Sequence, residues 1–181
     1  MIFMKRFKKI VFLVILFFSF NFLNSYSDVV DKVEINGNQR ISTETIMIFG
    51  DISIGKNYEK SDISLIIKKL YQTTFFSNIS AELINNKLII VVSENPIVNT
   101  IIFKGEEAEK YTEKIREIIS VREKGSFVNT NIKRDVNHIK SFYRMLGFYF
   151  VKIDAEVQKL EKNKVNIIYS INKGEKAKIA K

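Results

Sequence analysis

The same order of predicted secondary-structure elements occurs twice in this 181-residue chain. Residues 28–96 predict strand, helix, helix, strand, strand, and residues 97–174 predict that order again. Alternating apolar and polar residues indicate the strands, and apolar residues three and four positions apart indicate the helices. Because each copy has fewer than about 80 residues, each can form only a small hydrophobic core. The sequence therefore predicts two small units in tandem.

Matched residues support this repeat. The distance between partners grows from 68 to 77 residues along the chain, as longer loops in the second copy would produce. The predicted fold class is α+β, in which each unit is a three-stranded mixed sheet covered on one face by two helices. The matched residues, first copy before second, are Gly37 and Gly105, Tyr71 and Tyr143, Phe76 and Phe148, and Lys87 and Lys164.

The N-terminus has the pattern of a secretory signal peptide over residues 1–27. Four basic residues precede an unbroken apolar run over residues 10–18, and small residues precede a predicted cleavage between Ser27 and Asp28. The alternative is a retained membrane anchor. The apolar stretch is shorter than the roughly 20 residues that a membrane-spanning helix needs, which favours cleavage.

Composition excludes several classes of site. The chain has no cysteine and one histidine, so it can form neither a disulfide framework nor a site with two imidazoles. Its net charge of +9 suggests an anionic partner. Four of the basic residues lie in the predicted signal peptide, however, and the others are scattered without interleaved aromatic residues. We therefore expect no nucleic-acid partner, and we expect no cofactor.

No catalytic arrangement is evident, and we predict that the protein is not an enzyme. Asp135 and His138 are one helical turn apart, which we interpret as a surface pair rather than a general base. Glu106, Glu107 and Glu109 could suggest a metal site. The helix dipole adequately explains acidic residues in a first helical turn, so we predict no metal.

Five short motifs, in this order and spacing, resemble the POTRA domains of the Omp85 family. The similarity covers residues 28–181 and includes a strand and turn, two helix ends and two junctions. The motifs are Val33–Ile41, Leu70–Phe76, Glu94-Asn95-Pro96, Phe142–Tyr149 and Ile171–Glu175.

The resemblance implies a domain organisation and a location. It implies a first POTRA-like domain over residues 28–96 and a second over 97–174, while residues 175–181 would begin a third. The chain would then be the N-terminal fragment of an exported protein on the periplasmic face of the outer membrane. Implied partners are unfolded outer-membrane protein precursors, accessory assembly lipoproteins and the membrane itself, through the C-terminal barrel of that family.

A three-stranded sheet leaves strand edges with unpaired backbone groups, and a client strand could pair with such an edge. The resemblance implies that the second strand of each unit is this edge. Alternatively the edges are only solvated, with Lys152 and Glu156 preventing pairing. Other functions that fit are a two-partner secretion transporter and a POTRA scaffold anchored in the inner membrane. The candidate client-binding residues are Ile79, Ser80, Ala81, Glu82, Leu83, Val151, Lys152, Ile153, Asp154, Ala155, Glu156 and Val157.

Overall fold

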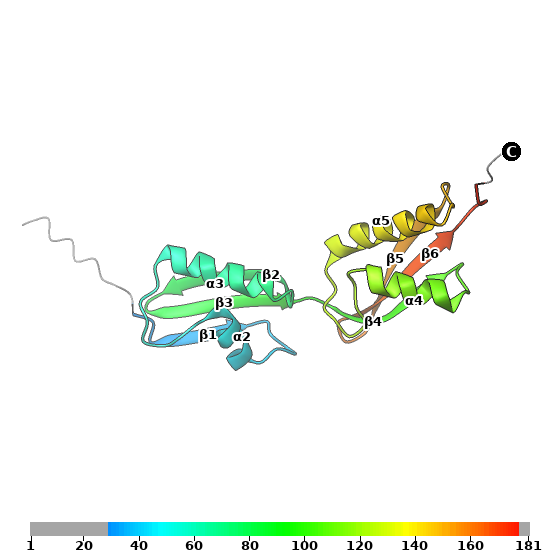
Figure 1. The fold of residues 1–181 in the computed structure, drawn as a ribbon. Coiled ribbons are helices and arrows are strands. Elements are labelled where there is room, and N and C mark those ends of the chain that lie inside the picture. Colours follow the sequence, from blue (N-terminus) through cyan, green and yellow to red (C-terminus); the bar gives the residue numbers. More distant parts are fainter. Residues whose placement is uncertain (1–28, 178–181) are drawn as a thin grey trace, which may run out of the picture.

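A computed structural model of the protein describes residues 29–177. The predicted signal peptide and its cleavage site at Ser27 and Asp28 lie outside the described residues. Figure 1 shows two units of similar architecture arranged end to end and joined by a short extended connection. Within residues 29–177, no helix combines the length and the apolar character needed to cross a membrane.

The first unit follows the predicted order of elements. Its sheet has the order β1-β3-β2, in which β1 is parallel to β3 and β2 is antiparallel to it. The sheet is therefore mixed, as expected. The elements are β1 (Lys32–Asn36), α2 (Thr43–Gly50), α3 (Lys60–Gln72), β2 (Phe76–Ile84) and β3 (Lys87–Glu94).

The second unit repeats this topology. Its sheet has the order β4-β6-β5, again with one parallel and one antiparallel pair, so the predicted α+β fold class is confirmed. The elements are β4 (Ile97–Lys104), α4 (Glu109–Ile118), α5 (Asn129–Met145), β5 (Lys152–Leu160) and β6 (Lys164–Asn172).

In each unit the helices lie over one face of the sheet (Figure 1). Each unit buries its own cluster of apolar side chains. Burial of this surface is the main stabilising contribution to each unit. In the first cluster Ile46, Leu70, Leu88 and Ile90 are fully buried. The fully buried members of the second include Ile115, Ile139, Tyr143, Ile167 and Tyr169.

A two-residue turn connects β2 to β3. Asn85 and Asn86 have φ angles of 48° and 61°, the left-handed conformation that Asn tolerates and that a two-residue hairpin needs. The β5–β6 hairpin uses the same conformation at Lys162 and Asn163, with φ angles of 57° and 52°. In both units, then, the last two strands are held in register by a tight turn.

Candidate functional site

The predicted client-binding strands are edge strands in the structure. Among residues 29–177, β2 pairs only with β3, and β5 pairs only with β6. Residues 79–83 lie within β2, residues 152–157 lie within β5, and Val151 immediately precedes β5. The first strands, β1 and β4, form the opposite edges of the two sheets.

Backbone hydrogen bonds show which N–H groups of β2 point away from the sheet. The N–H of Ile79 donates to the hydroxyl of Tyr71 on α3 at 3.1 Å, so it faces outward rather than toward β3. Backbone direction alternates along an antiparallel strand. The outward N–H groups of the predicted segment are therefore those of Ile79, Ala81 and Leu83.

The same reasoning applies to β5. The N–H of Ile97 on β4 donates to the carbonyl oxygen of Asn163 at 3.0 Å, so the backbone of Asn163 faces β4. Because backbone direction alternates, the backbone groups of Lys164, Asn166 and the following alternate residues of β6 face β5. Their hydrogen-bonded partners on β5 are Leu160, Gln158 and the preceding alternate residues. The residues whose N–H groups face outward are Ile153, Ala155, Val157 and Lys159.

Along a strand, both the face to which the side chain points and the edge to which the N–H points alternate from one residue to the next. The residues with outward N–H groups therefore direct their side chains to the helix-covered face, as the burial of Ile153 confirms. Lys152 and Asp154 have exposed side chains, but their N–H groups bond β6. A substitution that removes one edge donor without breaking the ladder must therefore be made at a position such as Ala155.

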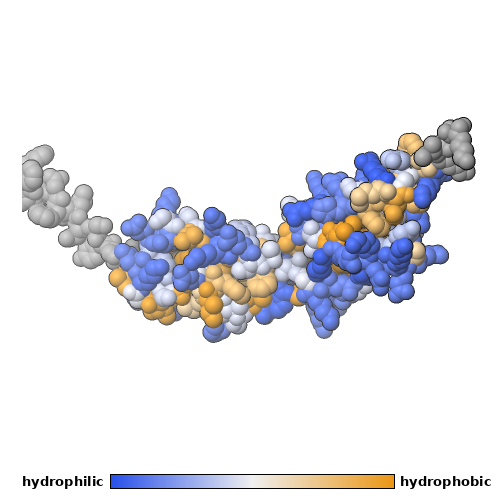
Figure 2. Space-filling model, viewed as in Figure 1, coloured by the Kyte–Doolittle hydropathy of each residue, from blue (hydrophilic) through white to orange (hydrophobic). Residues whose placement is uncertain are grey.

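Half-buried apolar side chains of α5 and β5 lie at the margin of the second core, beside this edge. We call Ile132, Val136, Ala155 and Val157 the α5–β5 strip. The flank of α5 that faces away from α4 carries Lys133, Lys140 and Arg144, by helical spacing. Figure 2 shows apolar patches surrounded by hydrophilic surface on both units. The β5 edge thus combines unpaired backbone, an apolar strip and three nearby positive charges.

Tyr71 and Tyr143 are not equivalent in the structure, although the sequence pairs them. Tyr143 is fully buried, four residues after buried Ile139, whereas Tyr71 is 41% exposed. Leu70 is the residue that lies fully buried four positions after buried Ile66. The pairing is therefore off by one residue, and Arg144 occupies the helical position of Tyr71.

The interpretation of Asp135 as half of a surface pair with His138 is wrong. Asp135 is fully buried and accepts hydrogen bonds from the backbone N–H groups of Ser120 and Val121, at 2.5 and 3.0 Å, and from the hydroxyl of Tyr169 at 3.0 Å. Its role is to hold the loop after α4 against α5 and β6. Its place on the apolar face of α5, four residues before Ile139, is the sequence signal that could have revealed this.

Glu106 is also buried, which its interpretation as a helix-dipole residue does not account for. It accepts hydrogen bonds from the Tyr143 hydroxyl at 2.6 Å, the Ala108 N–H at 3.0 Å and the Lys173 ammonium at 3.2 Å. Burial raises the pKa of Glu106, but these three bonds outweigh it and the pKa lies below its usual 4.5. The carboxylate therefore ties the end of β6 to α5.

The junction between the units is two residues long. Asn95 is bound to the first unit, since its N–H donates to the Phe75 carbonyl at 2.7 Å and its side-chain amide to the Thr74 carbonyl at 2.8 Å. The carbonyl of Pro96 accepts from the N–H of Phe127 in the second unit at 2.7 Å. The proline ring fixes φ of Pro96, which removes one of the four backbone torsions of the two junction residues.

Glu94 anchors the first unit at this junction. Its carboxylate accepts hydrogen bonds from the N–H groups of Gln39, Arg40 and Ile41 at 2.8–2.9 Å and pairs with the Arg40 guanidinium at 3.3 Å. Burial raises the pKa of Glu94, but the backbone bonds outweigh it and hold the pKa below 4.5. This arrangement explains the acidic residue of the predicted junction motif.

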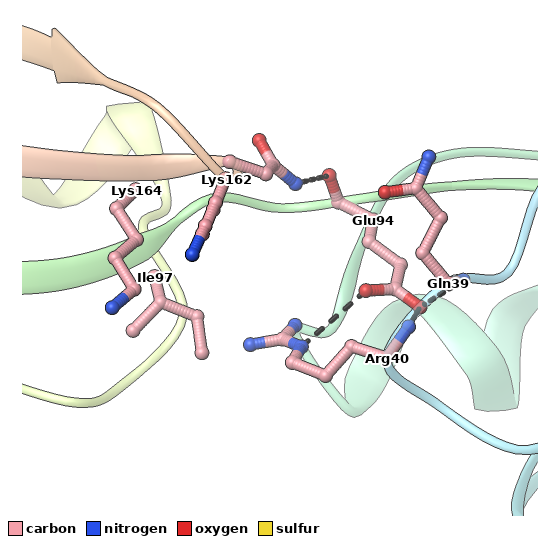
Figure 3. A pocket seen from close by; sticks show the side chains of 7 residues that line it. Gln39, Arg40, Glu94, Ile97, Lys162 and Lys164 are labelled. Atoms are coloured by element: carbon pink, nitrogen blue, oxygen red, sulfur yellow. Dashed lines mark hydrogen bonds and ion pairs between the residues drawn. The ribbon is translucent and has the colours of Figure 1, made fainter.

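A pocket of about 190 Å³ lies between the units beside Glu94. Figure 3 shows Glu94 held by Arg40 from the first unit, with Lys162 and Lys164 approaching from the β5–β6 hairpin. The side-chain amide of Asn163 donates to the backbone carbonyl of Glu94 at 3.2 Å. The hairpin of the second unit therefore contacts the end of β3 directly.

Comparison with known proteins agrees with this fold. Residues 96–174, which contain the second unit, match the model of the POTRA family, described as a surface antigen variable number repeat. The N-terminal domain of Omp85 from Thermosynechococcus elongatus has the same fold. It has a TM-score of 0.52 and 14% identity, over 81% of this chain and 63% of that one. The resemblance to POTRA domains of Omp85 proteins is thus confirmed.

Two curated relatives are outer membrane protein assembly factors. The chain is 26% identical over 152 residues to the outer membrane protein assembly factor BamA of Neisseria meningitidis serogroup B. It is 23% identical over 148 residues to BamA of Neorickettsia risticii. These alignments cover 83% and 81% of this chain but only 19% and 20% of the relatives. The chain therefore spans about a fifth of the length of the curated relatives that it matches.

Proposed function

We propose that this chain is the periplasmic POTRA region of an outer-membrane β-barrel assembly factor, and that it receives unfolded barrel precursors by β-strand addition. The similarity to BamA supports the assembly role. The observation that carries strand addition is the β5 edge, where four outward N–H groups run beside the apolar α5–β5 strip. A strand that pairs there gains main-chain hydrogen bonds and buries apolar side chains in one step.

Main-chain pairing suits a receptor for many different precursors. The hydrogen bonds of a β-ladder do not depend on client side chains, whereas alternate side chains of the added strand face the α5–β5 strip. Alternating apolar and polar residues are the pattern of membrane barrel strands. The site would therefore accept barrel segments as a class without requiring one sequence.

The proposal includes a wider organisation. Residues 28–96 and 97–174 would be the two POTRA domains, after a signal peptide over residues 1–27 that is removed between Ser27 and Asp28. The units would scaffold accessory lipoproteins and be attached to the outer membrane through a C-terminal barrel. The two-residue junction supports the scaffolding role, because it limits how the units can rotate relative to each other.

The test is a peptide titration with matched variants. Ala155→Pro removes one outward N–H and keeps the β5–β6 ladder, because proline is tolerated on an edge strand where the N–H faces solvent. We expect a fluorescent barrel-strand peptide to bind this variant at least about tenfold more weakly, a loss of about 1.4 kcal/mol. Ala155→Ser, which keeps the N–H, should bind within about twofold of wild type.

Lys152→Glu separates backbone pairing from charge attraction. The Lys152 side chain lies on the sheet face away from α5, so its charge should change peptide affinity little. Circular dichroism would establish that all three variants are folded. If Lys152→Glu abolishes binding while Ala155→Pro binds normally, strand addition at β5 is wrong. Absence of peptide binding to wild type would favour a scaffold that does not bind clients.

A further inference from the structure

We infer that the two client-facing edges are unequal: β5 is open to an added strand, whereas the Tyr71 hydroxyl closes β2. The segment that β5 accepts would be extended, apolar at the alternate positions that face α5, and acidic rather than basic beside that helix. This inference rests on the proposed function and assigns the receiving site to one unit. It also assigns to Tyr71 the role of blocking strand addition at the β2 edge.

The first step is the contact between Tyr71 and β2. The Tyr71 hydroxyl accepts the outward N–H of Ile79 at 3.1 Å, so this donor is already paired within the protein. A strand that adds to β2 across Ile79 would have to displace the phenol ring. Only Ala81 and Leu83 keep unpaired outward N–H groups in the predicted segment, and two donors give a short ladder.

The second step is the lack of such a contact at β5. Arg144 occupies the helical position of Tyr71, and the hydroxyl of the preceding residue, Tyr143, donates instead to buried Glu106 at 2.6 Å. Within residues 29–177, no side chain bonds an outward N–H of β5. Three donors, at Ile153, Ala155 and Val157, are therefore available in the predicted segment of β5, and Lys159 beyond it adds a fourth.

The third step concerns the chemistry of the occupant. Side chains of an added strand on the helix-covered face would meet the α5–β5 strip, which favours apolar residues at alternate positions. Lys133, Lys140 and Arg144 line the adjacent flank of α5. Three positive charges repel a basic segment and attract an acidic one, which complements this surface.

The experiment uses the two-unit chain, residues 28–181, and a nine-residue peptide that alternates valine or tyrosine with threonine and carries an aspartate at each end. Amide exchange followed by NMR reports each edge separately. With the wild-type chain, we expect the peptide to slow exchange at Ala155 and Val157 and to leave Ala81 and Leu83 unchanged. Equal protection of both edges would overturn the inference while leaving strand addition intact.

Tyr71→Phe removes the hydroxyl and keeps the ring. In the free chain we expect the Ile79 amide to exchange at least fivefold faster, and with peptide we expect new protection at Ala81 and Leu83. Tyr111→Phe on α4, away from both edges, should behave as wild type. Unchanged exchange at Ile79 in Tyr71→Phe would overturn the inference. That measurement needs no peptide, so it stays decisive even if a lack of binding refutes the proposed function.

A second peptide tests the charge argument. Replacing both terminal aspartates with lysines should weaken binding at least fivefold at low salt, and raising the salt concentration should reduce the difference because exposed charges are screened. Equal affinity of the two peptides would overturn the predicted acidic character. Stronger binding of the lysine peptide would overturn it as well.

Discussion

At the residue scale, two glycines show how closely the units repeat. Gly37 and Gly105 follow β1 and β4 with φ angles of 85° and 82°. A Cβ atom at Gly37 would overlap the carbonyl oxygen of Val92, and one at Gly105 would overlap that of Ile171. The sequence predicts only a turn at these positions. The structure adds close contact with the end of the central strand, which no side chain could tolerate.

We therefore predict that Gly105→Ala destabilises the second unit strongly. The substitution combines a left-handed backbone with an overlap against a fixed carbonyl, so we expect a loss of about 3 kcal/mol or more in the free energy of unfolding. Gly55→Ala is the control, because Gly55 has φ of 84° but open space around its Cα. It should cost only about 1–2 kcal/mol. Equal losses in urea unfolding would contradict the role of the contact.

Glu94 gives a prediction of pH dependence. Its folded pKa lies below the usual 4.5, so its carboxylate stabilises the fold above about pH 4.5, and this contribution is lost as pH falls through the folded pKa. Glu94→Gln should cost about 2 kcal/mol at pH 7, because a buried charged acceptor of three N–H groups is replaced. The difference from wild type should shrink toward zero at pH 3.

Urea unfolding at pH 7, 5, 4 and 3 measures this difference. Glu161→Gln on the exposed β5–β6 turn is the control, and it should match wild type at every pH. A gap between wild type and Glu94→Gln that is the same at pH 3 and pH 7 would show that the charge of Glu94 contributes nothing.

At the element scale, the sequence predicted the order and type of the strands and longer helices, because their apolar periodicity follows from burial on one face. It failed where two adjacent residues carry similar side chains. Leu70-Tyr71 and Phe142-Tyr143 look alike in sequence, yet Tyr143 packs in the place of Leu70. A shift of one residue on a helix turns a side chain by about 100°, and only the packing of α5 on β6 decides it.

Which strands form the candidate edges could be predicted, but which of their N–H groups point outward could not. Family resemblance implied which strand is the edge, whereas the direction of each N–H depends on pairing register, which turns and ladders set. The exposed side chains of Lys152 and Asp154 draw attention to these residues, but their N–H groups bond β6. The contact of Tyr71 with Ile79 could not be foreseen either, because it joins a helix to a strand across the core margin.

At the scale of the whole molecule, the two cores share no buried residue in the part of the chain that the structure describes. We predict that residues 28–96 and 97–181, expressed separately, each unfold cooperatively. Their stabilities should lie within about 1–2 kcal/mol of those in the whole chain, since few hydrogen bonds, such as that from Asn163 to Glu94, join the units. If neither half shows a transition while the whole chain does, the proposed division into two domains is wrong.

The strand order has a mechanical consequence. In each unit the chain enters along an edge strand, β1 or β4, and leaves along the central strand that runs parallel beside it, β3 or β6. The entry and exit points therefore lie at opposite ends of the sheet. A pull on the two ends acts along the strands, so it loads all hydrogen bonds of that parallel ladder in shear at once instead of unzipping them one by one. Units joined in this way would resist tension together while their β2 and β5 edges stay outside the line of force.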